Sequence, residues 1–155
     1  MSTLLTGQGW GRKYTSLAKE ISTWSKDPST QVGAVVIGEK GQLLSQGYNG
    51  FPRGINDTDD RLNNRERKYE LVVHAEMNAI YNASFNGVSL KDSTLYVYGL
   101  PICSECAKGI IQVGIKKVVA TRPRIYNSDW DKSTKAAEAL FREAEVMYLI
   151  DVEEE

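Results

Sequence analysis

The sequence predicts an α/β domain in which a five-stranded mixed sheet lies between helices, a three-layer α/β/α sandwich. Apolar residues near the N-terminus recur at helical spacing, and two strand-like runs separated by a polar turn follow them. Helical and strand-like segments then alternate to the end of the chain, as expected for helices packed on both faces of a sheet. No linker-like stretch divides residues 1–155, so we expect one domain.

The first three elements follow from apolar spacing. Apolar side chains from Tyr14 to Trp24 fall on one helical face, and Asp27-Pro28 ends the helix because proline disfavours helix in the preceding residue. A continuous apolar run then indicates a strand covered on both faces, and a polar turn returns the chain as a second strand. The expected spans are 12–25 for the helix and 32–37 and 43–48 for the strands.

The second half of the chain predicts alternating helices and strands. A helix begins near His74, and Gly114 is placed to end a later helix as its C′ residue. The remaining strands are expected at 94–98, 117–121 and 146–150, and the remaining helices at 107–113 and 132–144. Between the halves, residues 50–68 are polar and charged, which predicts a long loop or flap, and loops of this length are usually functional or disordered.

Charge and composition exclude several functional classes. The 155 residues include 19 basic and 20 acidic side chains, a net charge of −1 that argues against a dedicated binder of long nucleic acid. A small anionic substrate held by a few local cations remains compatible with this balance. The N-terminus has no signal-peptide core and no run reaches membrane-spanning length, so we expect a soluble, intracellular, cytoplasmic protein without a membrane partner.

One histidine and two cysteines form the candidate metal site. His74 stands in His74-Ala75-Glu76, and the cysteines stand in Cys103-Ser104-Glu105-Cys106. Both motifs are expected at helix starts, which tend to lie along one edge of an α/β sheet. One imidazole and two thiolates suit zinc, and three protein ligands leave the open position of a catalytic site. Glu76, beside a ligand but not coordinating, is the candidate proton shuttle for a zinc-activated water.

Each part of this constellation has a simpler interpretation. A lone histidine is more often a structural residue, and a glutamate in a first helical turn often only favours the helix dipole. A Cys-x-x-Cys pair is also typical of thiol redox proteins and of buried thiols. The combination favours zinc, because the only histidine adjoins a glutamate and the only cysteines open a later helix.

The pairing of H-x-E with a later P-C-x-x-C is a signature of zinc-dependent nucleobase deaminases. The chain resembles the deoxycytidylate (dCMP) deaminase family of the cytidine deaminase superfamily, and the Gly47–Gly54 segment is its most specific feature. The matching segments are Ser25-Lys26-Asp27-Pro28, Gln31-Val32-Gly33-Ala34, Gly47-Tyr48-Asn49-Gly50-Phe51-Pro52-Arg53-Gly54, His74-Ala75-Glu76-Met77-Asn78-Ala79-Ile80, Cys106-Ala107-Lys108, Ile110-Ile111-Gln112 and Gly114-Ile115-Lys116.

The resemblance implies a cytidine deaminase-like fold and hydrolysis of dCMP to dUMP and ammonia, which supplies dUMP for thymidylate synthesis. It also implies a homo-oligomer, commonly a hexamer, activated by dCTP and inhibited by dTTP. The residues expected to bind substrate are Lys26, Asn49, Ala75 and Tyr126, with Lys26 and Tyr126 at the phosphate. The residues expected to bind effector are Gly47, Asn49, Gly50 and Pro52. Carboxylates at Asp57, Asp59 and Asp60 are candidates to hold Mg²⁺ with the effector triphosphate.

The sequence departs from the family pattern in one place and leaves rivals open. Ile102 intervenes between Pro101 and Cys103, where the family has proline directly before the cysteine. No histidine or cysteine remains for a second zinc site, so one zinc per chain is expected. The rivals are a tRNA adenosine or free cytidine deaminase of the same fold, a non-catalytic zinc-stabilised binding module, and a thiol redox protein.

Overall fold

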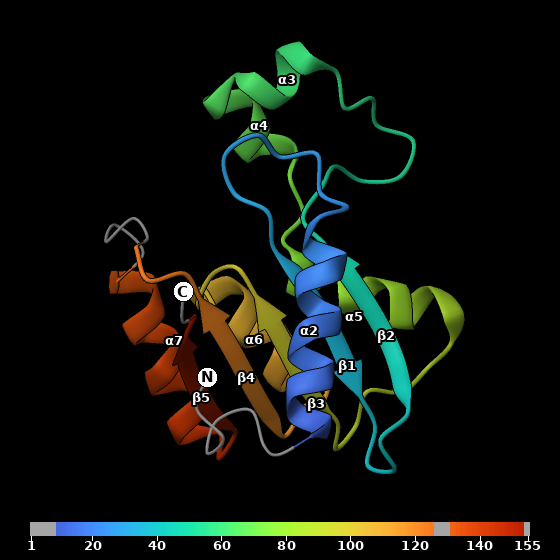
Figure 1. The fold of residues 1–155 in the computed structure, drawn as a ribbon, viewed down its shortest axis with the longest axis vertical. Helices are drawn as coiled ribbons and strands as arrows, with labels where there is room; N and C mark the ends of the chain where they lie inside the picture. The colour runs from blue at the N-terminus through green and yellow to red at the C-terminus, as the bar shows by residue number, and fades with distance from the viewer. Residues whose placement is uncertain (1–8, 126–130, 154–155) are drawn as a thin grey trace.

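The computed structural model describes residues 9–125 and 131–153, within which five strands form one mixed sheet (Figure 1). The strands are β1 (Gly33–Ile37), β2 (Leu43–Tyr48), β3 (Thr94–Tyr98), β4 (Lys117–Arg122) and β5 (Met147–Val152). Their spatial order is β2-β1-β3-β4-β5. β1 pairs antiparallel with β2 and β3, whereas β3, β4 and β5 are mutually parallel. The predicted five-stranded mixed sheet is confirmed.

β1 is the second strand of the sheet, between β2 and β3, and all of its residues are buried. Successive side chains of a strand point to opposite faces of a sheet. Ala34 and Val36 therefore join the hydrophobic cluster on one face, and Val35 and Ile37 join the cluster on the other. Because helices cover both faces, this strand is a continuous apolar run, the pattern that predicted it.

Helices cover both faces of the sheet (Figure 1). One face packs against α2 (Trp10–Ser22), and the other packs against α5 (Ala75–Asn86), α6 (Ser104–Gln112) and α7 (Asp131–Glu143). Several bounds differ from the prediction by one to three residues. The chain leaves α2 after Ser22 through tight turns, and α6 begins earlier than predicted because the Cys103 side chain caps it.

The segment predicted as a loop contains two short helices, α3 (Asp59–Asn63) and α4 (Arg65–Leu71), which we call the flap. In Figure 1 the flap stands above the sheet, away from the other helices. Side chains cap both helices: Thr58 accepts a hydrogen bond from the Arg61 N–H, and Asn64 accepts one from the Arg67 N–H. These caps satisfy backbone donors that a short helix otherwise leaves to water.

A backbone bridge fixes the chain just before His74. Gly50, after β2, and Val73 exchange two hydrogen bonds, with N–O distances of 3.1 and 2.8 Å. The first turn of α5 is thereby tied to the end of β2. None of the described helices has the length and apolar character needed to cross a membrane.

Candidate active site

His74, Cys103 and Cys106 meet at the N-terminal ends of two neighbouring helices. His74 is the N-cap residue of α5, and Cys103 is the N-cap residue of α6. Nδ1 of His74 lies 3.3 Å from Sγ of Cys106 and 3.5 Å from Sγ of Cys103. The three candidate ligand atoms lie within 4.8 Å of one another. The structure therefore brings together the residues that the sequence motifs singled out.

The three donor atoms fit a tetrahedral zinc ion. With Zn–N near 2.0–2.1 Å and Zn–S near 2.3 Å, a nitrogen and a sulfur at two tetrahedral corners lie about 3.5 Å apart. The observed nitrogen–sulfur distances, 3.3 and 3.5 Å, agree with this spacing. Among the described residues, the group contains these three ligands and no carboxylate. A fourth corner is thus left for water or substrate, as in catalytic zinc sites.

The protein surroundings favour a thiolate at Cys103. A hydrogen bond from Cys106 lowers the pKa of the Cys103 thiol to about 4, against the effect of burial, and His74 lowers it further. The hydrogen bond to Cys103 in turn raises the pKa of His74, which burial alone would lower. The N-terminus of α6 adds the positive end of a helix dipole. The thiolate charge therefore lies on Cys103, whereas the hydrogen bond to Cys103 raises the pKa of the Cys106 thiol.

Glu76 lies in the first turn of α5 and is only 5% exposed. Burial raises the pKa of Glu76 to about 7, although the charge of His74 works in the opposite direction. A carboxyl group with this pKa accepts and releases a proton near neutral pH, which is the property a proton shuttle needs.

A cavity of about 380 Å³ adjoins these groups. His74, Glu76 and Cys103 lie on its lining together with residues of the flap. The flap contributes Leu62, Asn63, Arg65, Lys68 and Tyr69. Small-molecule sites usually occupy about 300–1,000 Å³, so this cavity has the size of a site for a small ligand.

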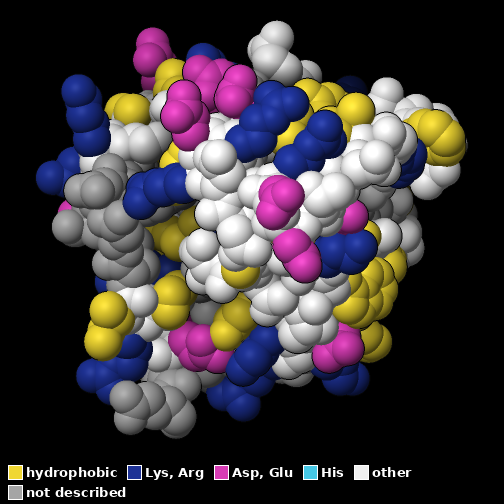
Figure 2. Space-filling view, turned by 90° about the horizontal axis from the view of Figure 1, so that it is seen from above, with side chains coloured by type: hydrophobic (Ala, Val, Ile, Leu, Met, Phe, Trp, Pro, Cys, Tyr) yellow, Lys and Arg dark blue, Asp and Glu magenta, His cyan; other side chains and the backbone are white. Residues whose placement is uncertain are grey.

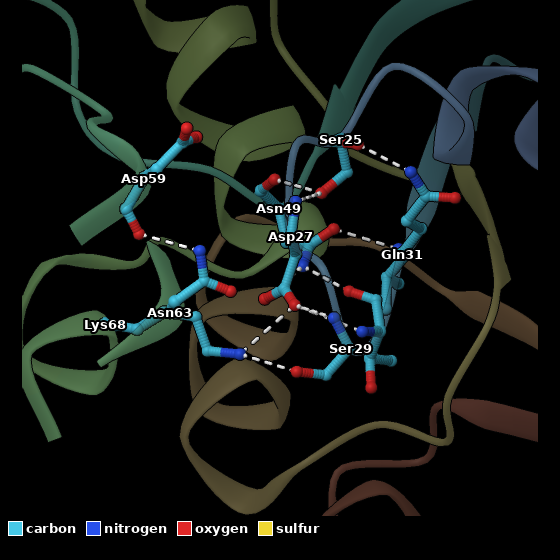
Figure 3. A network of polar contacts seen from close by, with 10 residues as sticks. Ser25, Asp27, Ser29, Gln31, Asn49, Asp59, Asn63 and Lys68 are labelled. Atoms are coloured by element: carbon cyan, nitrogen blue, oxygen red, sulfur yellow. Dashed lines mark hydrogen bonds and ion pairs between the residues drawn. The ribbon is translucent and has the colours of Figure 1, made fainter. Parts of the chain in front are cut away.

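A buried ion pair joins the flap to the segment before β1 (Figure 3). Nζ of Lys68 donates to Oδ1 of Asp27 and to Oγ of Ser29, both at 3.1 Å. The Lys68 and Asp27 side chains are only 8% and 10% exposed. A lysine in such a place needs its counter-charge, because an unpaired buried ammonium is strongly unfavourable. The pair therefore holds α4 over the cavity.

Asn49, which follows β2, holds the same segment through hydrogen bonds of its side chain (Figure 3). Its Oδ1 accepts the N–H of Val32 at 2.9 Å, and its Nδ2 donates to the carbonyl of Thr30 at 2.9 Å. The side chain is buried and lines the cavity. Its position beside the cavity fits the predicted contact with a nucleotide, and its amide also has a structural task that the sequence did not indicate.

The loop before Cys103 is held from β5. Ile102 is fully buried, and its N–H donates to the hydroxyl of Tyr148 at 3.0 Å. The Tyr148 ring packs edge-on against Phe141, with 4.9 Å between ring centroids. The isoleucine that departs from the family pattern brings a backbone donor where proline has none, and Tyr148 satisfies it.

Three of the predicted nucleotide-binding residues lie beside a second, smaller cavity of about 160 Å³. Lys26 lines this cavity and forms an ion pair with Asp57, with 3.1 Å between Nζ and Oδ2. Gly50 lines it as well, and Asn49 lines both cavities. The structure thus places Lys26 away from the lining of the cavity that contains Glu76.

The remaining predicted residues are distributed more widely. Ala75 is fully buried and lines the larger cavity between His74 and Glu76. Gly47 is buried where β2 crosses α5, and Pro52 is exposed. Tyr126 lies outside the described residues. No local sequence pattern marks the flap side chains on the cavity lining or Tyr148, because their contacts join distant segments of the chain.

The sequence matches the model of the family described as the cytidine and deoxycytidylate deaminase zinc-binding region over residues 8–122, which is most of the chain. The chain belongs to this family. The zinc in the description agrees with the His-Cys-Cys geometry found here. As a member of this deaminase family, the chain is a hydrolase, and Zn²⁺ is its expected metal.

Individual relatives and a solved structure are also similar to this chain. Mouse deoxycytidylate deaminase is 38% identical over 146 residues, covering 90% of this chain and 78% of its own. An uncharacterized deaminase of Aliivibrio fischeri is 37% identical over 138 residues, covering 88% and 90%. The dCMP deaminase of cyanophage S-TIM5, solved with dCMP and dUMP, superposes with a TM-score of 0.70 at 26% identity, covering 90% and 94%.

Proposed function

We propose that this deaminase hydrolyses dCMP to dUMP and ammonia and so supplies dUMP for thymidylate synthesis. The observation that carries the proposal is the buried carboxyl of Glu76 beside a His-Cys-Cys triad in the wall of a nucleotide-sized cavity. The similarity to a phage enzyme solved with dCMP and dUMP supports this substrate over other cytosine compounds.

The residues divide the chemistry between them. His74, Cys103 and Cys106 would hold zinc, which supplies a Lewis acid that makes water nucleophilic near neutral pH. In the reaction, the oxygen of water bonds to C4 of the cytosine and the bond from C4 to the amino nitrogen breaks. Glu76 accepts the proton of the water, passes it to N3, and helps to protonate the nitrogen that leaves as ammonia.

The test is ammonia release from dCMP, CMP, deoxycytidine and dCTP by the purified, zinc-loaded protein. We expect dCMP to give the highest kcat/KM. A non-catalytic zinc module would release no ammonia from any of the four. A thiol redox protein would also be inactive towards these substrates, and it would be indifferent to zinc chelators. Activity on adenosine in tRNA alone would point to the RNA-editing branch of the fold.

The charge distribution supports a small substrate over long nucleic acid. Figure 2 looks onto the end of the molecule that carries the flap, and acidic and basic side chains are interspersed over this face. A protein that follows a nucleic-acid backbone usually presents a stripe of basic side chains. The described residues on this face form no such stripe.

We also propose that dCTP activates and dTTP inhibits the enzyme, with Mg²⁺ bound to the triphosphate, in a homohexamer. The smaller cavity supports an effector site, because it is lined by Lys26, Asn49 and Gly50 and shares a wall with the larger one. Regulation requires that the two effectors differ in affinity for the active and inactive arrangements. The measurement is a set of dCMP saturation curves without effector, with dCTP–Mg²⁺ and with dTTP–Mg²⁺.

Repeating these saturation curves with Asn49→Ala tests whether Asn49 belongs to the effector site or to the substrate site. Loss of regulation with unchanged basal turnover would place Asn49 in the effector site alone. Loss of turnover as well would place it at the substrate. Superimposed curves for the unaltered protein would show that no control by dCTP or dTTP exists.

A further inference from the structure

A deaminase that prefers a nucleotide to its nucleoside needs a cation that recognises the phosphate. Among the described residues that line the larger cavity, two are cations, Arg65 and Lys68. Lys68 is already committed, because its ammonium group binds Asp27 and Ser29 and is almost fully buried. Binding a phosphate would require Lys68 to leave Asp27 unpaired. Arg65 is therefore the cation that remains available.

Arg65 is exposed at the start of α4, and its guanidinium lies 5.3 Å from the ring centroid of Tyr69, also on the cavity lining. In the part of the chain that the structure describes, no carboxylate forms an ion pair with Arg65. Its neighbour Arg67 differs, because it pairs with Glu70 at 3.7 Å and does not line the cavity. The Tyr69 ring holds the Arg65 guanidinium near the cavity without neutralising its charge.

The two ends of the substrate match two parts of the cavity lining. In dCMP the reacting C4 and the 5′-phosphate lie at opposite ends of the molecule. Glu76 and the metal ligands lie at the starts of α5 and α6, and Arg65 lies on the flap, which stands above the sheet (Figure 1). A base bound beside Glu76 would leave its phosphate to reach the lining that the flap contributes.

We propose that Arg65 binds the 5′-phosphate of the substrate and makes the enzyme selective for nucleotides over nucleosides. This inference rests on the proposed deamination of dCMP and assigns to Arg65 the role that the sequence analysis gave to Lys26. Lys26 pairs with Asp57 and lines the smaller cavity. The planar guanidinium of arginine matches two phosphate oxygens at once, which a lysine ammonium does not.

The test compares kcat/KM for dCMP and for deoxycytidine in the zinc-loaded protein and in R65A, R65K, R67A and K26A. Loss of a charge-assisted contact predicts that R65A lowers kcat/KM for dCMP by about 10- to 100-fold. Its kcat/KM for deoxycytidine, which has no phosphate, should stay unchanged, and this also shows that R65A folds and holds zinc. R65K should fall between R65A and the unaltered protein. R67A, on the same helix, is the matched control and should retain the full preference for dCMP.

A direct binding measurement separates this inference from the proposed function. We expect inorganic phosphate to bind the unaltered protein and R67A by calorimetry, and to bind R65A at least about tenfold more weakly. If the unaltered protein releases ammonia from neither substrate, the proposed function fails, and the phosphate titration still tests Arg65. The assignment of Arg65 is wrong if R65A keeps the preference for dCMP and normal phosphate binding. It is also wrong if K26A, and not R65A, removes that preference.

Discussion

Two glutamates near the metal ligands differ in burial, and that difference predicts different roles. Glu76 is buried, whereas the Glu105 side chain, between the two cysteines, is 80% exposed and pairs with Lys108. We expect E76Q to keep its zinc and to lower kcat by about 10²–10⁴-fold, the usual contribution of a general acid–base group. The measurements are steady-state ammonia release and zinc content.

The matched control for E76Q is E105Q, which removes a carboxylate from the same neighbourhood without touching the cavity lining. E105Q should retain normal turnover. Near-normal turnover in E76Q would refute the proton-shuttle role, and an equal loss in E105Q would show that the effect is electrostatic and not specific to Glu76.

Tyr148 contacts the backbone beside a metal ligand, and we expect its removal to weaken zinc binding. Y148F leaves the buried N–H of Ile102 without an acceptor, which costs about 1–3 kcal/mol. Because Ile102 precedes a ligand, we expect faster loss of zinc to a chelator as well as lower stability. The control is Y14F, which removes the exposed bond from Tyr14 to the carbonyl of Gly41. If Y148F and Y14F release zinc at the same rate, Tyr148 does not position the cysteine loop.

At the scale of elements, the close approach of β2 to α5 depends on Gly47. A Cβ at Gly47 would lie 2.4 Å from the backbone N of Ala79 and 2.7 Å from the carbonyl O of Ala75. We expect G47A to destabilise the protein by about 1–3 kcal/mol in urea unfolding, because both atoms belong to helix backbone that must shift. G50A is the control, since its Cβ would meet only Tyr48, at 3.8 Å. Equal stability of the two variants would contradict this explanation for Gly47.

The strands were predictable from sequence because local patterns determine them. The buried strand β1 is a continuous apolar run, and the predicted span of β2 agrees with the observed Leu43–Tyr48. The flap helices were not predicted, because each is shorter than isolated helices require and their stability comes from distant contacts. Thr58 and Asn64, with their side-chain caps, were the local signal that composition obscured.

The metal ligands were predictable for a different reason, since residue type alone limits which side chains can bind zinc. The roles of the charged residues that line the cavities were not predictable from residue type. Lys26 and Lys68 look alike in sequence, yet Lys26 is exposed in an ion pair and Lys68 is buried under the flap. Their environments depend on partners far away in the chain, which local patterns do not reveal.

At the scale of the whole molecule, every histidine and cysteine of the chain belongs to one site. Zinc bound at about a thousandfold above its Kd adds about 4 kcal/mol to folding stability. For a domain of this size, chelation should therefore lower Tm by about 8–16 °C. A thiol reagent should find both cysteines reactive after chelation and protected before it. Unchanged Tm and thiol reactivity on chelation would contradict metal binding by these residues.

The ion pair between Lys68 and Asp27 also has a consequence for how the sequence can evolve. Removing either partner leaves an unpaired buried charge, which lowers the free energy of unfolding by about 3–5 kcal/mol. Replacing both partners with apolar residues often leaves the stability unchanged. A double-mutant cycle on D27A and K68A measures this coupling. A lineage that changes one position alone loses much of a folding stability that is typically about 5–15 kcal/mol. The two positions, 41 residues apart, should therefore change together during evolution. The residue allowed at position 68 of the flap then depends on the residue at position 27, outside the flap.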